Sequence, residues 1–517
     1  MSWEPEIEEL RRRQELARRM GGPENVERQH KAGRLTVRER VDALLDAGSF
    51  HETGGLAGKA TYADGRLEGF LPANSVLGTG RIDGRRVVVC GDDFTVRGGA
   101  ADAAIHAKQV YGERMARELR LPIVRLVDGT GGGGSVKTYE QTGRTYLPGN
   151  PGWDLVVALM SEVPVVAAAL GPVAGLGAAR VAHAHFSLMV RGVSQLFVAG
   201  PPVVERAFGS PVGKEELGGV DIHGANGSVD NVVDSETEAF EQVRRFLSYL
   251  PSNVWQLPPR QASADDPKRR DEALLSLIPR NRRRGYDPRA LLGHVLDRDS
   301  LFELGHTWGP SVVTGLARLD GYPVGVLASD PKHAGGALTA DGSEKLTRFA
   351  DLCDTFHLPV VHFVDQPGFL VGVAAERAST IRKGVRALAA VYQASIPWVS
   401  IIVRRVFGVA GAGHGNVQAL NLRYAWPSAD WGSLPLEGGI EAAYKRELAA
   451  APDREQLQRE IEARLNAVRS PFRAAEVFNV EEIIDPRDTR PLLTDWVRLA
   501  YELEATRLGP KARGARP

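Results

Sequence analysis

The sequence contains an internal duplication, and this feature constrains the fold more than any other. The segment "RIDGRRVVVCGDDFTVRGGA" at 81–100 is matched by "RLDGYPVGVLASDPKHAGGA" at 318–337. The first glycines of the two Gly-Gly pairs, Gly98 and Gly335, are 237 positions apart (335 − 98). Self-similarity at one separation indicates two copies of a single structural unit.

The match continues through two further pairs of segments. "RLPIVRLVDGTGGG", which begins at Arg120, aligns with "HLPVVHFVDQPGF", which begins at His357, at the same separation. Beyond these, "SEVPVVAAALGPVAGLG" aligns with "ASIPWVSIIVRRVFGVAG", and the separation falls to 233 (397 − 164). Because several matches occur in order at a nearly constant separation, a chance resemblance is excluded.

Each copy has the pattern of an α/β domain. The short apolar runs "PIVRLVD" and "PVVHFVD" indicate buried strands. The segments "AADAAIHAKQVYGERMARELR" and "SEKLTRFADLCDTFH" have apolar residues spaced as on one face of a helix. Between the copies, prolines and charged residues at 257–288 predict a linker. We therefore predict an α/β fold with two tandem domains, 1–260 and 261–517.

Composition excludes several classes of protein. Lys+Arg and Asp+Glu both total 64, so no net charge attracts nucleic acid or an anionic membrane. No uninterrupted apolar run reaches about 18 residues, and direct membrane insertion is not expected. The first residues lack an apolar signal core, which predicts a cytoplasmic protein. The only cysteines, Cys90 and Cys353, exclude a disulfide framework, and no metal site is expected.

Glycine-rich turns follow the apolar strands of both copies. They read "DGTGGGG" and "GPVAGLG" in the first copy, and "DQPGFLVG" and "FGVAGAG" in the second. Neither a P-loop nor a dinucleotide fingerprint has this spacing. Two backbone N–H groups at a helix start can form an oxyanion hole for a thioester enolate, so two copies predict two holes. The alternative is that these glycines only permit close packing.

The chain resembles the carboxyltransferase (β) subunits of biotin-dependent acyl-CoA carboxylases, such as propionyl-CoA and methylcrotonyl-CoA carboxylase. The resemblance covers nearly the whole chain and rests on "KAGRLTVRERVDALLDAGSF", "DFTVRGGA", "GPVAG", "KEELGG", "GGALTADGSEKLTRF", "FVDQPGFLVG", "YAWPSA" and "IIDPRDTR". It implies two crotonase-like domains (ClpP/crotonase superfamily), the first binding acyl-CoA and the second carboxybiotin. It also implies a homohexamer of two stacked trimers, with active sites between domains of different chains.

The resemblance also implies roles for individual residues. The hole for the acyl enolate falls at Gly175 and Leu176, and the hole for biotin at Val409 and Ala410. The remaining implied contacts are Gly98, Gly99, Gly131, Gly132 and Ala412 for the acyl-CoA, and Gly335, Gly336, Pro367, Gly368, Phe369 and Gly408 for biotin. The implied mechanism needs no protein base: carboxybiotin releases CO2, the biotin enolate takes the α-proton of the thioester, and the carbanion attacks CO2.

Two departures from the family pattern concern the substrate. The family's "DSGGARIQEG" is "DGTGGGGSVKTYEQ" here, without its Arg and Gln, and the family's "YGGAYD" is "FGVAGAG". The acidic position of the second motif, which helps to set acyl preference, aligns with Ala412, so an unusual acyl group is expected. A Met-Lys-Met biotinylation motif and an ATP-grasp signature are both absent from the sequence. The chain therefore needs a biotin carboxyl carrier and a biotin carboxylase as partners.

Alternatives remain at this stage. The chain could be the carboxyltransferase subunit of a decarboxylase that moves carboxyl from a malonyl-type CoA onto biotin, or a catalytically altered scaffold. His414 could contact biotin or the acyl group. Asp92–Asp93 suggests acid/base chemistry, but its repeat partner Ser329–Asp330 favours a structural role. The basic run 280–289 could meet CoA phosphates or RNA, although a solvated surface is favoured because aromatic residues are not interleaved.

Overall fold

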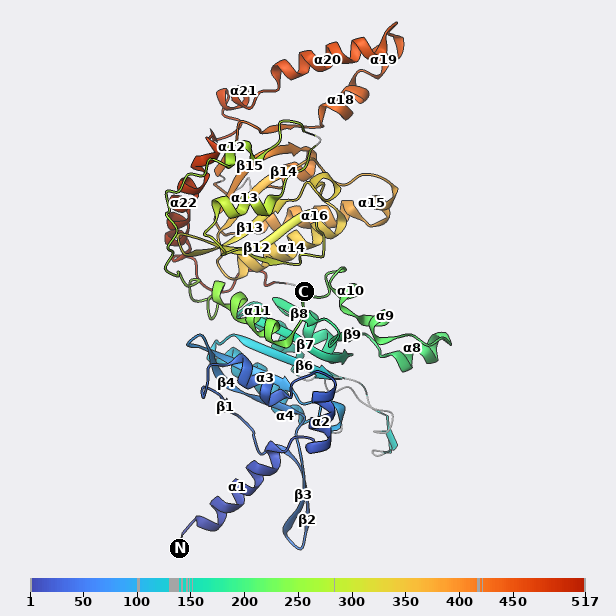
Figure 1. The fold of residues 1–517 in the computed structure, drawn as a ribbon, viewed down its shortest axis with the longest axis vertical. Coiled ribbons are helices and arrows are strands. Elements are labelled where there is room, and N and C mark those ends of the chain that lie inside the picture. Colours follow the sequence, from blue (N-terminus) through green and yellow to red (C-terminus); the bar gives the residue numbers. More distant parts are fainter. Residues whose placement is uncertain are drawn as a thin grey trace. The chain divides into compact units, whose positions relative to one another are not determined.

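The protein is described by a computed structural model over residues 2–99, 103–129, 139–140, 143–145, 147, 149–150, 152–282, 284–415, 419–420 and 422–515. The chain divides into two compact units. The first comprises Met1–Gln256 with Gly509–Pro517, and the second comprises Leu257–Leu508. Each unit is built around its own sheet of eight strands (Figure 1).

The first sheet combines an antiparallel edge with a parallel body. In spatial order its strands are β1 (His51–Glu52), β4 (Ser75–Ile82), β5 (Arg85–Asp92), β6 (Ile123–Gly129), β7 (Val165–Ala174), β8 (Phe186–Val190) and β10 (Asn231–Val233). The pairs β1/β4 and β4/β5 are antiparallel, and the later pairs are parallel. β7 forks, because it pairs with β8 at 166–169 and then with β9 (Gln195–Phe197) at 172–174.

The second sheet repeats the first strand for strand. Its order is β11 (Phe302–Leu304), β12 (Val312–Leu319), β13 (Tyr322–Ser329), β14 (Val360–Gln366), β15 (Trp398–Phe407), β16 (Leu422–Ala425) and β18 (Glu482–Ile483). β15 forks as β7 does, to β16 at 399–402 and to β17 (Asp430–Gly432) at 405–407. The pairing Val88–Ile123 recurs as Gly325–Val360, which preserves the separation of 237. The predicted duplication of an α/β fold is confirmed.

Helices surround both sheets (Figure 1). In the first unit they are α1 (Glu4–Arg18), α2 (Pro23–Lys31), α3 (Val37–Leu44), α4 (His106–Leu119), α6 (Trp153–Leu159), α7 (Leu176–Ala182), α8 (Pro201–Phe208), α9 (Lys214–Gly218), α10 (Val220–His223) and α11 (Glu236–Tyr249). In the second they are α12 (Leu274–Leu277), α13 (Pro288–Val295), α14 (Ala340–Thr355), α15 (Val373–Arg377), α16 (Thr380–Gln393), α17 (Gly408–Ala412), α18 (Leu436–Ala443), α19 (Lys445–Ala450), α20 (Arg454–Val468), α21 (Pro471–Glu476) and α22 (Thr489–Glu504). Within the described ranges, none of these helices has the length and apolar character needed to cross a membrane. The hairpin of β2 (Gly58–Ala63) and β3 (Arg66–Pro72) stands apart from both sheets.

Local sequence explains the central elements. All seven residues of β6 and of β14 are buried, as their continuous apolar runs require of strands covered on both faces. Thr36 and Glu39 form a reciprocal capping box at the start of α3, and Thr339 caps α14 through the amide of Gly342. Buried lysines at matched positions join α4 and α14 to their sheets. Lys108 Nζ donates to Ser75 O, and Lys345 Nζ donates to Val312 O, both at 2.7 Å.

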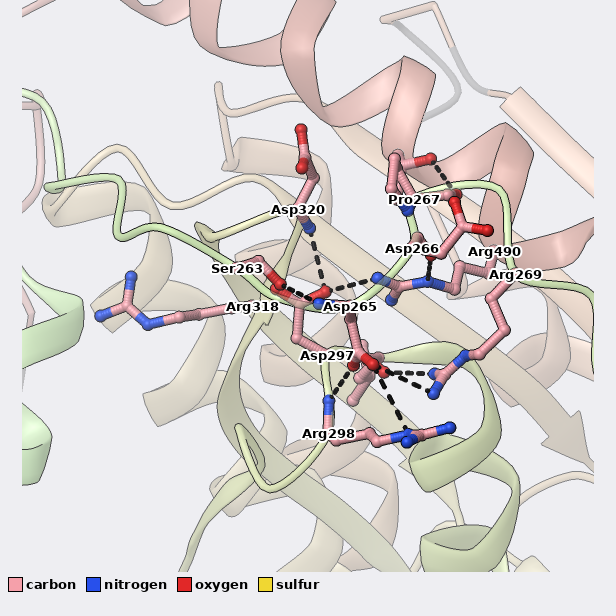
Figure 2. Close-up of polar contacts among 12 residues, drawn as sticks. Ser263, Asp265, Asp266, Pro267, Arg269, Asp297, Arg298, Arg318, Asp320 and Arg490 are labelled. Carbon is pink, nitrogen blue, oxygen red and sulfur yellow. Dashed lines mark hydrogen bonds and ion pairs between the residues drawn. The ribbon is translucent and has the colours of Figure 1, made fainter.

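The segment predicted as a linker packs onto the second unit. Arg490 of α22 donates to Asp266 O at 2.9 Å and to the Asp297 carboxylate at 2.7 Å, and its side chain is almost completely buried (Figure 2). The amide of Arg298 donates to Asp265 at 2.5 Å. Prolines and charges in 257–288 therefore mark an extended strap held by ion pairs, because its partners lie some 30 to 220 residues away along the chain.

Candidate active site

The glycines that follow β7 and β15 have the same positive φ. Gly175 follows β7 with φ 60° and ψ −122°, and Gly408 follows β15 with φ 61°. A residue with a side chain rarely adopts such positive φ values, so both positions require glycine. Their separation is 233 (408 − 175), which equals the separation of the strands that precede them. The duplication therefore extends to the geometry of the turns.

The backbone amides at the first of these turns differ in whether they already have a hydrogen-bond acceptor. Gly175 N–H donates to Phe197 O of β9 at 3.0 Å, so Gly175 holds the turn closed and is not itself a free donor. Leu176 and Gly177 begin α7, and first-turn amides have no acceptor within their own helix. Val409 and Ala410 lie in the same position at the start of α17. The pair Gly175–Leu176 stays a prediction; because the Gly175 amide is engaged, we take Leu176 and Gly177 as the candidate donors.

Several residues of the two turns are at least partly exposed at the surface of their units. Leu176 is partly buried and lines a pocket of about 70 Å³ with Trp153 of α6. Val409 is 64% exposed, whereas Ala410 is buried. Ala412, predicted to contact the acyl group, is exposed at the end of α17.

The turn at Gly98 and Gly99 packs against the end of β6. Gly98 and Gly99 have φ values of 62° and 71°. A Cβ at Gly129 would lie 3.1 Å from Gly98 O, so only glycine permits this close approach. The predicted contacts Gly131 and Gly132 lie outside the described residues.

The structure brings the predicted biotin contacts together in the second unit. Gly335 and Gly336 have φ values of 63° and 84°, which match the turn of the first unit. The segment of Gly368 and Phe369, preceded by Pro367, lies beside this turn, because Leu338 N–H donates to Gly368 O at 2.9 Å. A Cβ at Gly335 would meet no atom within 4 Å, so the space beside this glycine is open.

An arginine that sequence reasoning missed joins this turn to the sheet. Arg405 of β15 donates through Nη2 to Gly335 O at 2.7 Å and through Nε to Asp365 at 2.6 Å. Arg404 donates to the other oxygen of Asp365 at 2.8 Å. The fully buried Asp365 carboxylate is thus held by two guanidinium groups, and that of Arg405 also binds the turn at Gly335.

The matched aspartate of the first unit is neutralised from a different element. Asp128 is also fully buried, and Arg40 of α3 donates to it at 2.8 Å while binding Glu236 of α11. Gly171 stands where Arg404 stands in the second unit (404 − 171 = 233), and a Cβ there would lie 2.1 Å from Asp128. The signal in the sequence was the terminal Asp of each apolar strand, because a buried carboxylate requires a cation.

Asp92 has the structural role that its repeat partner suggests. The amide of Asp128 donates to Asp92 at 3.3 Å, and the amide of Asp365 donates to Ser329 Oγ at 3.3 Å. A hydroxyl therefore replaces the carboxylate at the matched position. Burial raises the pKa of Asp92 to about 6, although the charge of Arg180 opposes the shift.

We expect Asp92→Asn to stabilise the protein at pH 7. The folded-state pKa of about 6 exceeds the ordinary value of 3.8, so wild-type stability falls as pH rises between these values. Asparagine keeps the acceptor and carries no charge, and the gain should be about 3 kcal/mol at pH 7. Calorimetric melting at pH 4 and pH 7 measures it. A variant that is equally stabilised, or destabilised, at both pH values would contradict the assignment.

Two histidines near the turns are hydrogen-bonded to the backbone. His414 Nδ1 lies 2.6 Å from Gly411 O at the end of α17. His185 joins two elements, because Val165 N–H donates to its Nδ1 at 3.0 Å and its Nε2 lies 3.0 Å from Met160 O. Among the described residues, no group of three or more His, Cys, Asp or Glu side chains could hold a metal ion.

Comparisons with known proteins agree with this geometry. Residues 28–514 match the family described as the carboxyl transferase domain. The chain is 34% identical over 511 residues to the carboxyltransferase subunit of propionyl-CoA carboxylase from Haloferax mediterranei, covering 96% of each protein. It is 31% identical over 506 residues to the alpha subunit of methylmalonyl-CoA decarboxylase from Veillonella parvula, again covering 96% of each.

A solved structure extends the comparison to the fold. Transcarboxylase 12S, described as a hexamer with methylmalonyl-coenzyme A and methylmalonic acid bound, matches with a TM-score of 0.86 at 30% identity. The match covers 100% of this chain and 98% of that one. The predicted pair of crotonase-like domains is confirmed. The chain therefore belongs to the carboxyl transferase family and is a carboxyltransferase related to the subunits of biotin-dependent acyl-CoA carboxylases.

Proposed function

We propose that this chain transfers a carboxyl group from carboxybiotin, carried by a partner protein, to the α-carbon of a short acyl-CoA. The acyl-CoA binds the first unit and carboxybiotin binds the second. The observation that carries this proposal is the matched pair of glycine turns, each followed by helix-start amides without an acceptor in their own helix. One turn serves each of the two carbonyl substrates.

The chain contributes donors and shape to this reaction. The amides of Leu176 and Gly177 stabilise the negative charge on the oxygen of the thioester enolate. Those of Val409 and Ala410 do the same for the ureido oxygen of biotin. Carboxybiotin supplies an activated carboxyl group when it is bound. The open space at Gly335 and the Arg405 clamp behind it fit the flat bicyclic ring.

The reverse reaction is a second candidate, favoured by the similarity to the alpha subunit of methylmalonyl-CoA decarboxylase. The same two holes serve both directions, because the enolates are the same. The partner that copurifies with the chain separates the two: a biotin carboxylase supports carboxylation, and a membrane subunit supports decarboxylation. A non-catalytic scaffold is disfavoured, since both turns retain φ values near 60°.

We expect the purified chain alone to show no ATP-dependent carboxylation. Mixed with a biotinylated carrier protein and a biotin carboxylase, it should fix radiolabelled bicarbonate onto an acyl-CoA. A panel of acetyl-, propionyl-, butyryl-, hydroxylated and branched acyl-CoAs identifies the substrate, and Ala412 stays our candidate for the acyl contact. ATP-dependent fixation by the chain alone would contradict the need for a partner.

We expect the chain to assemble as a homohexamer of two stacked trimers. Large apolar side chains are exposed on and beside α8, where Val198 is 99%, Val203 60% and Phe208 80% exposed. Clustered exposed apolar groups mark interaction surfaces. Light scattering should give a mass near six times 55.9 kDa. An active protein of one times that mass would contradict the assembly.

A further inference from the structure

Three matched positions near the glycine turns at Gly175 and Gly408 carry charged side chains in the first unit and uncharged ones in the second. In the first unit, Glu113 of α4 lies between Arg125 of β6 and Arg180 of α7. Arg125 Nη2 donates to one oxygen of Glu113 at 2.9 Å, and Arg180 pairs with the other. Burial alone would raise the pKa of Glu113, but the two arginines lower it to about 2. An ionised triad therefore occupies these positions, and Glu113 and Arg180 line the pocket of about 70 Å³ that Leu176 also borders.

The second unit has no ion at the same positions. The separation of 237 places Ala350 at the position of Glu113 and His362 at that of Arg125, and the separation of 233 places Gly413 at that of Arg180. The structure has a cavity of about 20 Å³ here. A water molecule needs about 10–15 Å³ in this measure, so the cavity holds one molecule of a few atoms.

The walls of this cavity suit a small neutral molecule. Most are hydrocarbon, including Val364, Ala387, Leu388 and Ala410. His362 also lines the cavity, and its Nδ1 is buried without a hydrogen-bond partner. A hydrogen bond with the backbone of His414 raises the pKa of the His362 ring, but burial and the neighbouring His414 ring lower it to about 3. The imidazole is thus neutral at pH 7, and an anion would find no counter-charge.

We propose that this cavity is a holding site for CO2 in transit between the two substrates. The inference rests on the proposed function, in which carboxybiotin releases CO2 in the second unit. Ala410 contributes its amide to the proposed biotin hole and its side chain to the cavity wall. CO2 is linear and uncharged, and its electron-poor carbon suits the lone pair of a neutral imidazole nitrogen. It binds here without a covalent bond, whereas the pocket at the matched place of the first unit is lined by the ionised groups of Glu113 and Arg180.

Crystals of the full chain, pressurised with CO2 and separately with xenon, test the site directly. We expect an elongated density beside His362 Nδ1 under CO2 and a xenon peak at the same place. An ordered water on Nδ1 that neither gas displaces would overturn the proposal, as would a cavity that neither gas enters. This readout needs neither biotin nor a carrier protein, so it stands independently of the proposed function.

A cavity-filling variant tests the consequence for the reaction. Ala387→Val adds two carbons inside the cavity, and Ala389→Val makes the same change at an exposed position of the same helix. In Ala387→Val, we expect the ratio of carboxylated acyl-CoA formed to carboxybiotin consumed to fall by roughly tenfold. A change of one or two carbons in an apolar pocket alters discrimination between ligands on this scale. Carboxybiotin consumption itself should persist, and Ala389→Val should match wild type.

The controls separate the possible failures. An unchanged ratio in Ala387→Val, with gas excluded from its crystals, would overturn the holding site and leave the proposed function intact. If the wild type consumes no carboxybiotin with any acyl-CoA, the proposed function fails instead. Should Ala387→Val not assemble, the gas-pressurised wild-type crystals decide.

Discussion

Replacement of Gly175 by alanine is expected to lower kcat for acyl-CoA carboxylation by about 10²–10³-fold, the loss typical of one oxyanion-hole donor. A Cβ at this position would meet no atom within 4 Å, so no steric clash contributes. The effect comes from the backbone, because φ 60° with ψ −122° is accessible only to glycine. Relaxation of this strain moves the amides of Leu176 and Gly177. KM for the acyl-CoA should change less than kcat, since the hole acts on the transition state.

The matched control is Gly192→Ala. Gly192 has φ 70° and equally open surroundings, but it lies in the turn between β8 and β9 and carries no proposed donor. Gly408→Ala repeats the test on the biotin side. Steady-state kinetics on protein of unchanged oligomeric mass gives the comparison. If Gly175→Ala kept a rate close to that of Gly192→Ala, the turn would serve packing only.

Replacement of Arg40 by alanine is expected to lower the free energy of unfolding more than any other substitution considered above. The side chain is 1% exposed and binds Asp128, Glu236 and Leu170 O at 2.6–3.0 Å. Arg40→Ala removes the cation from the buried Glu236 and leaves Asp128 only the longer contact of 3.5 Å with Arg34, and breaking such a buried pair costs about 3–5 kcal/mol. For a unit of this size, the melting temperature should fall by roughly 10 °C in calorimetry.

Arg38 provides the control on the same helix. It pairs with Glu52 at 2.9 Å, but its side chain is 25% exposed, and such pairs contribute less than about 1 kcal/mol. Arg38→Ala should therefore melt close to wild type. Equal melting temperatures for Arg40→Ala and wild type would show that Asp128 and Glu236 are satisfied without Arg40.

The sequence predicted the duplication, the α/β class and the strands at the core, because these depend on local patterns. Apolar runs ending in Asp128 and Asp365 became β6 and β14, and the two separations, 237 and 233, reappear as strand register. Gly175 and Gly408 were singled out because glycine-rich turns follow the apolar strands of both copies. A positive φ is a property of one residue, and the sequence reports it because glycine stands at that position.

The rest depends on contacts between distant segments. Phe197 O takes the amide of Gly175 only because β7 forks to β9, which no periodicity reveals. Arg40 lies 88 residues from Asp128, whereas Arg404 lies 39 from Asp365. Equivalent carboxylates are thus neutralised by unrelated arginines. The strap at 257–288 was taken for a linker for the same reason, since its partners are remote.

The fork of β7 and β15 has a consequence for how such enzymes diverge. Each turn is held by the hydrogen-bond ladder of the forked strand, and a ladder does not depend on side-chain identity. Ala174–Gly177 and Phe407–Ala410 share only their glycine, yet the backbone at Gly175 and Gly408 differs by 1° in φ. The shape of each turn therefore depends on a torsion angle and on strand pairing, so the side chains around the glycine can change while the turn keeps its form.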